Sequence, residues 1–160
     1  MPVILVSTEG PLFQQEISES SIKHLKVAAG MLEDLKTDAE AHIPVQGADA
    51  LTVQMLCALL ERHKDDPVVP DDWQKLPDRV QPSQADREAF KSVPGIQISN
   101  LFKATNFVQS QLLMNIVACF LGEIITGTDE KGVQDYFGTP YTVTPEQEKE
   151  IDEKYPITFY

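Results

Sequence analysis

Cysteine, histidine and tryptophan are scarce in this chain, with two, three and one of them among 160 residues. Two cysteines are too few for the disulfide framework of a small secreted domain. Cys57 and Cys119 both lie in apolar runs, so we expect buried free thiols in a reducing compartment, the cytoplasm or the nucleus. No apolar run approaches the roughly 20 residues of a membrane-spanning helix. The first residues lack a basic segment, so we expect no secretory signal.

Basic residues are also few. Thirteen lysines and arginines stand against 25 aspartates and glutamates, which gives a net charge of −12. An acidic surface repels nucleic acids and anionic membranes, so we expect neither as a partner. Hydrophobic residues make up 42% of the chain, which is ordinary for a globular protein. A chain of this length is long enough to bury a full core.

The motifs of common catalytic and nucleotide-binding sites are missing as well. There is no glycine-rich phosphate loop. His24, His42 and His63 are scattered without the spacing of a metal site, and we interpret them as ordinary surface or edge residues. Cys57 and His63 do not make a nucleophile and base without contact and a third group that orients the base. We therefore expect no catalytic activity, no metal and no cofactor.

The first third of the chain shows strand patterns followed by helix patterns. The apolar run over 3–6, the turn residues over 9–11 and the apolar residues that follow predict two strands joined by a turn. We expect a helix from about Ser18, a short second helix over 28–36 and a brief strand over 42–47. With helices dominating the remainder, the sequence predicts an α+β fold.

The middle of the chain contains one clear helix and one long irregular segment. Met55, Leu56, Leu59 and Leu60 recur at helical spacing and predict one apolar face. Prolines and acidic residues then crowd the segment over 64–87, and we interpret it as a mobile surface loop, with order resuming near residue 88. Asp65, Asp66, Asp71 and Asp72 lack the order of a calcium-binding loop, so we interpret them as solvated.

The last third of the chain predicts three helices. The helix over 112–125 is apolar around a wide arc, which is typical of a helix buried on more than one side. A short helix before Gly138 places Val133, Tyr136 and Phe137 on one side. In the last helix, which has strong start signals at 144–147, Ile151 and Tyr155 are nearly the only large apolar residues. Periodicity alone leaves two alternatives open: these helices bind another protein, or they fold back on the helix over 112–125.

Several short motifs occur in the order and spacing of one known family. They are "LVSTEGPLF", "MLEDL", "IPV", "HKDDP", "ATNFV", "LLMNIVACFLGEIITGTDEKGVQDYFG" and "TPEQEKEI". The motif "HKDDP" is the most specific, and "ATNFV" is similar to the family's Ala-Ala-Asn-Tyr-Leu motif. Each motif is weak alone, but together they cover nearly the whole length. By these motifs the chain resembles the S-phase kinase-associated protein family, the small adaptors of SCF-type ubiquitin ligases.

The resemblance implies a BTB/POZ fold over residues 1–125, a small sheet flanked by helices, and a helical F-box-binding extension over 126–160. It implies a non-catalytic adaptor that bridges the N-terminal domain of a cullin and F-box substrate receptors for ubiquitin-dependent degradation. Asn106 and Phe107 stand at the Asn-Tyr positions and would contact the cullin. The expected F-box contacts are Leu113, Ile116, Phe120, Val133, Tyr136, Phe137, Ile151 and Tyr155.

The resemblance leaves alternatives and shows departures. An elongin-C-like adaptor or a self-associating BTB module is the nearest alternative, and the helices beyond Gly127 argue against the first of these. A weak homodimer is expected when no F-box protein is bound. Pro145 matches a proline that is hydroxylated and glycosylated in some protist relatives. Asp86 and Arg87 replace a tryptophan–aspartate pair, and Ser99 replaces a large apolar residue.

Overall fold

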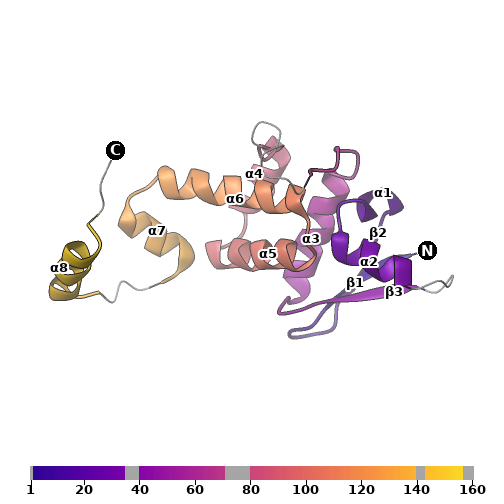
Figure 1. Cartoon of the computed structure of the whole chain (residues 1–160), viewed down its shortest axis with the longest axis horizontal. Helices are drawn as coiled ribbons and strands as arrows, with labels where there is room; N and C mark the ends of the chain where they lie inside the picture. The colour runs from indigo at the N-terminus through magenta and orange to yellow at the C-terminus, as the bar shows by residue number, and fades with distance from the viewer. Residues whose placement is uncertain (1, 35–39, 71–79, 140–142, 157–160) are drawn as a thin grey trace.

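The computed structural model describes residues 2–34, 40–70, 80–139 and 143–156. Within these ranges the fold is α+β, as the sequence predicts, with a small sheet and eight helices (Figure 1). In chain order the elements are β1 (Val3–Ser7), β2 (Gln14–Ile17), α1 (Glu19–Ile22), α2 (Lys26–Asp34), β3 (Ala41–Val45), α3 (Ala50–Arg62), α4 (Gln84–Lys91), α5 (Gly95–Phe107), α6 (Gln111–Thr126), α7 (Glu130–Phe137) and α8 (Pro145–Lys154).

The sheet has three strands in the order β2-β1-β3. β2 pairs with β1 antiparallel through the predicted hairpin, and β3 pairs with β1 parallel. Side chains alternate along β1 and β3, so that Val3, Leu5, Ile43 and Val45 are buried on one face. On the opposite face of outer strand β3, the exposed Pro44 lies beside Val6 of β1.

Helices stack on the sheet in successive layers. α3 packs against β1 and β2, α5 packs against α3, and α6 packs against α5 (Figure 1). The predicted apolar face of α3 supplies Leu56, Leu59 and Leu60, all of them at most 1% exposed. A polar contact fixes α5 on α3, because the amide of Gln97 donates a hydrogen bond of 2.8 Å to the hydroxyl of Thr52.

α4 closes one side of this core. The ring of Phe90 meets that of Phe120 on α6 edge to face, with centroids 5.0 Å apart. The guanidinium of Arg87 donates two hydrogen bonds, of 2.7 and 3.0 Å, to the carboxylate of Glu123 on the same helix α6. Aromatic packing and this ion pair together hold α4 beside α6.

The predicted loop over 64–87 is shorter than expected. Ser83 begins α4 with a capping box, so residues 84–87 are helical and order resumes four residues earlier than the sequence analysis places it. At its start, the backbone N–H of Asp66 donates to the carbonyl of His63, which makes a tight turn. The centre of the segment, residues 71–79, lies outside the described residues, as do the terminal apolar residues 157–160.

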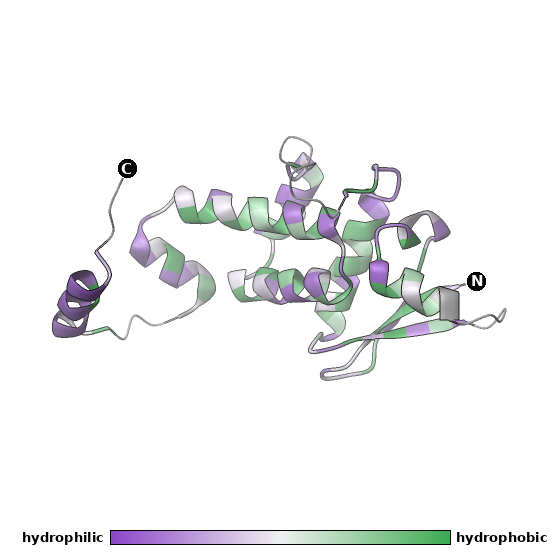
Figure 2. Ribbon diagram, in the orientation of Figure 1, coloured by the Kyte–Doolittle hydropathy of each residue, from purple (hydrophilic) through white to green (hydrophobic). Residues whose placement is uncertain are grey.

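α7 and α8 extend away from the sheet. α7 packs against α5, whereas α8 lies at the far end of the molecule beyond α7 (Figure 1). Figure 2 shows α8 as almost wholly hydrophilic, in contrast to the apolar faces within the layered body. No helix within the described ranges is both long and apolar enough to cross a membrane.

Candidate functional site

Three of the residues expected to bind an F-box are part of the core. Leu113, Ile116 and Phe120 of α6 are 0%, 0% and 1% exposed. Other parts of this chain already cover them, since α6 packs on α5 and on Phe90 of α4. These residues therefore have no surface to offer a partner, and the assignment is corrected: they belong to the core.

The three residues expected on α7 are half-buried. Val133, Tyr136 and Phe137 share one side of the helix, and the rings of Tyr136 and Phe137 meet edge to face at 5.0 Å. Asp129 caps the start of α7 by accepting a hydrogen bond of 2.9 Å from a backbone N–H. The short helix is thus defined at its start, and half of its apolar side remains open.

Tyr136 fixes where α7 sits. Its ring and its carbonyl oxygen lie directly over Gly95, the first residue of α5, so closely that a β-carbon at position 95 would overlap both. Position 95 requires glycine because any other residue would place a β-carbon against Tyr136. The backbone angles of Gly95 are not the reason. The contact between Gly95 and Tyr136 therefore sets the position of α7 on α5.

α8 is a complete helix whose residues are all exposed. The hydroxyl of Thr144 accepts a hydrogen bond from the backbone N–H of Gln147, whose side chain accepts one from the backbone N–H of Thr144. Pro145 occupies the first helical position, as its start signals predict. Ile151 is 49% and Tyr155 65% exposed, so the two expected anchor residues remain uncovered.

The sequence analysis missed one exposed residue near α7, Ile125 at the end of α6. It is 49% exposed, while the neighbouring Ile124 packs against the core. Consecutive helix positions point about 100° apart, and at this end of α6 Ile124 points towards the core while Ile125 points away from it. With Val133, Phe137, Ile151 and Tyr155, this residue makes up what we call the C-terminal surface.

Asn106 and Phe107, the expected cullin contacts, lie together at the end of α5. Asn106 is exposed, and Phe107 is half-buried against the core. The helix ends with Gln109 in the left-handed conformation at φ 54°, and its N–H donates to the carbonyl of Asn106. This turn presents Asn106 to solvent.

The two candidate surfaces lie at opposite ends of α5. Gly95, which carries α7, begins the helix, and Phe107 ends it. At about 1.5 Å per residue the two ends are about 18 Å apart. Because α5 packs on both α3 and α6, this spacing is fixed by the core.

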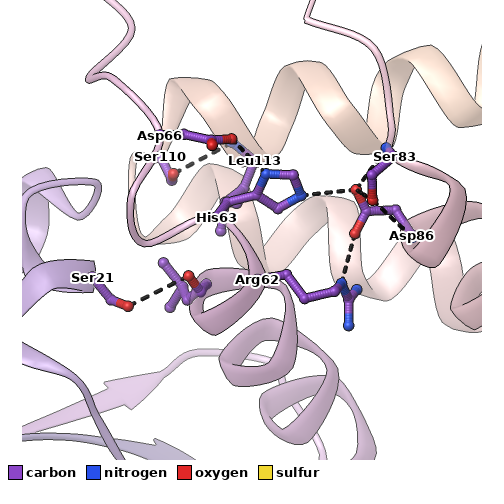
Figure 3. Close-up of polar contacts among 9 residues, drawn as sticks. Ser21, Arg62, His63, Asp66, Ser83, Asp86, Ser110 and Leu113 are labelled. Atoms are coloured by element: carbon purple, nitrogen blue, oxygen red, sulfur yellow. Dashed lines mark hydrogen bonds and ion pairs between the residues drawn. The ribbon is translucent and has the colours of Figure 1, made fainter.

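A buried ionic cluster joins α3 to α4 (Figure 3). The carboxylate of Asp86 accepts hydrogen bonds from Arg62 at 2.7 Å and from His63 at 2.8 Å. It also accepts from the backbone N–H and the hydroxyl of Ser83, at 2.9 and 2.8 Å. The other ring nitrogen of His63 lies 2.7 Å from the carboxylate of Asp66. We call these five residues the His63 cluster.

The geometry fixes the charge of His63. An ionised carboxylate only accepts hydrogen bonds, so a ring placed between two of them carries a proton on both nitrogens. The hydrogen bond to Asp86 raises the pKa of His63, against the effect of burial, and the contact with Asp66 adds to it. Burial alone would raise the pKa of Asp86, but the donors His63, Arg62 and Ser83 hold it well below its usual range.

The raised pKa of His63 predicts that stability falls as the solution becomes alkaline. Unfolded histidine loses its proton near pH 6.5, whereas folded His63 keeps it to a higher pH. The contribution of His63 to the free energy of unfolding should therefore be at its full value below pH 6.5 and fall by up to about 1.4 kcal/mol per pH unit up to the raised pKa. Urea unfolding between pH 6.5 and 8.5 measures this slope. The variant His63→Gln should lose it, whereas His42→Gln, at an exposed position, should keep it; equal slopes in all three proteins would contradict the assignment.

Two of the three histidines are not the surface residues that the sequence analysis expects. His63 is buried in the cluster, and His24 is 4% exposed. Burial, followed by the charge of Lys23, lowers the pKa of His24. Cys57 is a buried free thiol as predicted, and burial raises its pKa to about 12, whereas Cys119 is free but only half-buried.

No family model matches the chain, and no curated protein matches it either. Among the described residues there is no group of three or more histidine, cysteine, aspartate and glutamate side chains that could hold a metal ion. The candidate site is therefore defined by its own geometry, as two exposed surfaces on one rigid support.

Proposed function

We propose that the chain is a non-catalytic adaptor with a BTB/POZ fold, which joins a cullin to F-box proteins in an SCF-type ubiquitin ligase of the cytoplasm and nucleus. The element order supports this, with a small sheet first, layered helices next and two further helices last. The motifs quoted above support it independently, because they fall in the family's order over nearly the whole length.

One observation carries the proposal: α8 is well capped, yet every one of its residues is exposed. A ten-residue helix is marginal in water unless its apolar side packs against something. Within the chain, Ile151 and Tyr155 remain uncovered. A separate protein that covers them, together with the open side of α7, accounts for both features, and an F-box is the partner that the resemblance implies.

The mechanism we propose is positional. The cullin would bind near Asn106 at one end of α5, and the F-box would bind the C-terminal surface beyond the other end. A rigid spacing between two partners fixes where a receptor-bound substrate lies relative to the conjugating enzyme, which raises its effective concentration. In this role the adaptor itself needs no catalytic group.

The last two helices also weigh against the nearest alternative. An elongin-C-like adaptor would lack helices beyond Gly127, whereas this chain has α7 and α8 there. A self-associating BTB module would use the body of the fold and would give these helices no role. We therefore favour the F-box adaptor.

Affinity purification of the tagged chain with identification of its partners tests the proposal directly. We expect an F-box protein and a cullin in the same complexes. Recovery of neither would overturn the proposal, and recovery of a cullin alone would favour the elongin-C-like alternative.

A single substitution tests the cullin surface. Asn106→Lys places a long cation at an exposed helix position and should weaken binding of a purified cullin N-terminal domain about tenfold or more, as for a central interface residue. Phe107 is left unchanged because alanine there would also remove packing against the core. Calorimetry measures the affinity, and Gln54→Lys at an exposed position of α3 is the matched control. The cullin contact is rejected if both variants bind the cullin equally well.

A further inference from the structure

α8 carries a narrow apolar stripe beside an open groove. Ile151 and Tyr155 are four residues apart and therefore share one side of the helix. An open groove of about 480 Å³ runs along this side. Its lining residues are Val143, Gln147, Glu150, Ile151, Lys154 and Tyr155. The groove thus follows the helix and includes both exposed anchors.

Carboxylates border this stripe on both sides. Glu148 and Asp152, themselves four apart, follow one edge, and Glu150 lines the groove at the other. The amine of Lys154 lies over the ring of Tyr155, 5.7 Å from its centre, and so already has an aromatic contact. The remaining acidic residues, Glu146 and Glu153, lie on the side away from the stripe.

We propose that the segment docking on α8 is a basic amphipathic helix, whose apolar residues meet Ile151 and Tyr155 and whose lysines or arginines meet Glu148, Glu150 and Asp152. This rests on the proposed function, in which that segment belongs to an F-box protein. Two apolar anchors offer little area, so an acidic or neutral segment would gain too little to offset the cost of association. Basic side chains match the charges, and their aliphatic stems extend the apolar contact.

The geometry favours a helix as the docking segment. The backbone hydrogen bonds of α8 run along its own axis, so it offers no strand edge to which another strand could add. The lining residues recur every three or four positions along a ten-residue helix, which matches a helical occupant of similar length with anchors at the same spacing.

Designed peptides test the docking chemistry with the full chain. The probe is a fluorescent helical peptide of about 14 residues with leucines along one face and lysines on both sides of them; its twin carries glutamates in place of the lysines. Fluorescence polarisation should detect binding of the lysine peptide only. Glu148→Lys with Asp152→Lys should weaken that binding about tenfold or more, because like charges then face each other.

A matched variant distinguishes the effect of the carboxylates beside the apolar stripe from the effect of the net charge of the chain. Glu146→Lys with Glu153→Lys makes the same change in net charge on the far side of α8. It should weaken binding by less than about threefold, because both side chains are exposed and the ion pair of Glu153 with Lys149, at 3.9 Å, is a weak surface contact. Ile151→Asn should weaken binding without any change of charge. Equal loss in both double variants, or equal binding of the glutamate twin, would overturn the inference. The affinity purification tests the adaptor role separately. If the lysine peptide binds α8 but no F-box protein is recovered, this inference stands and the proposed function fails.

Discussion

Replacing Asp86 by alanine is expected to lower the free energy of unfolding by about 3–5 kcal/mol, the cost of leaving a buried charge without its partner. Asp86 is fully buried and accepts four hydrogen bonds from Arg62, His63 and Ser83. Its loss removes the half of the capping box in which Asp86 accepts from the backbone N–H of Ser83, and it leaves the protonated His63 with only Asp66. Urea denaturation at pH 6.5 measures the change through the midpoint and the slope of the transition.

Two further variants show whether charge or shape matters at this position. Asp86→Asn keeps the volume and an acceptor for Ser83 but removes the charge, so it should be less destabilising than alanine and should lower the pKa of His63. Glu88→Ala, at an exposed position of the same helix, should change stability by less than about 0.5 kcal/mol. A loss after Asp86→Ala no larger than that after Glu88→Ala would show that the cluster is not structural.

Replacing Gly95 by alanine is expected to displace α7 while the layered body stays folded. The added methyl group would meet the carbonyl oxygen of Tyr136 and, at 2.5 Å, its ring carbon Cδ1. The ring can rotate, but the carbonyl moves only with the helix. Overpacking of this kind typically costs about 1–3 kcal/mol, and here α7 can relieve it by moving away. Amide hydrogen exchange of residues 130–137 should become markedly faster, and affinity for an F-box protein should fall about tenfold or more.

Gly122→Ala is the control for this substitution. Gly122 lies within α6, and no atom is near enough to obstruct a β-carbon there. Alanine at this position should raise stability by about 0.4–1 kcal/mol, because it restricts the unfolded chain. If Gly95→Ala leaves the amide hydrogen exchange of α7 unchanged, then the contact of Tyr136 with Gly95 does not hold the helix in place. Faster exchange with normal F-box affinity would show that the contact between Gly95 and Tyr136 holds α7 in place but that α7 does not contribute to F-box binding.

Sequence periodicity predicts the regular elements of this fold because each one depends on local signals. The apolar run of β1, the apolar face of α3 and the start signals at Thr144 and Pro145 all lie within a few residues of the elements that they specify. The start of α4 was missed, although Ser83 and Asp86 have the spacing of a capping box. The prolines and charged residues around these positions favoured the interpretation of the whole segment as an irregular loop.

The burial of polar residues could not be predicted in the same way. His63 and Asp86 are 23 residues apart, and their contact depends on how α3 and α4 come together, which no local pattern encodes. Likewise, the apolar arc of α6 indicates that Leu113 and Phe120 are covered, but not whether this chain or a partner covers them. The surfaces at Asn106 and on α8 were accessible to sequence reasoning because their residues belong to short contiguous motifs.

The outer strand β3 has a consequence for how the protein behaves at high concentration. The N–H of Ala41 donates to the carbonyl of Pro2 at the start of β1, so alternate residues of β3 face β1 and the residues between them face the free edge. Pro44 is one of those between, and proline has no N–H to offer. An incoming strand would therefore lack one of the donors that it needs, which guards this edge against open-ended edge-to-edge pairing of sheets from different molecules. A protein that presents exposed apolar residues on α8 benefits from an edge that does not polymerise.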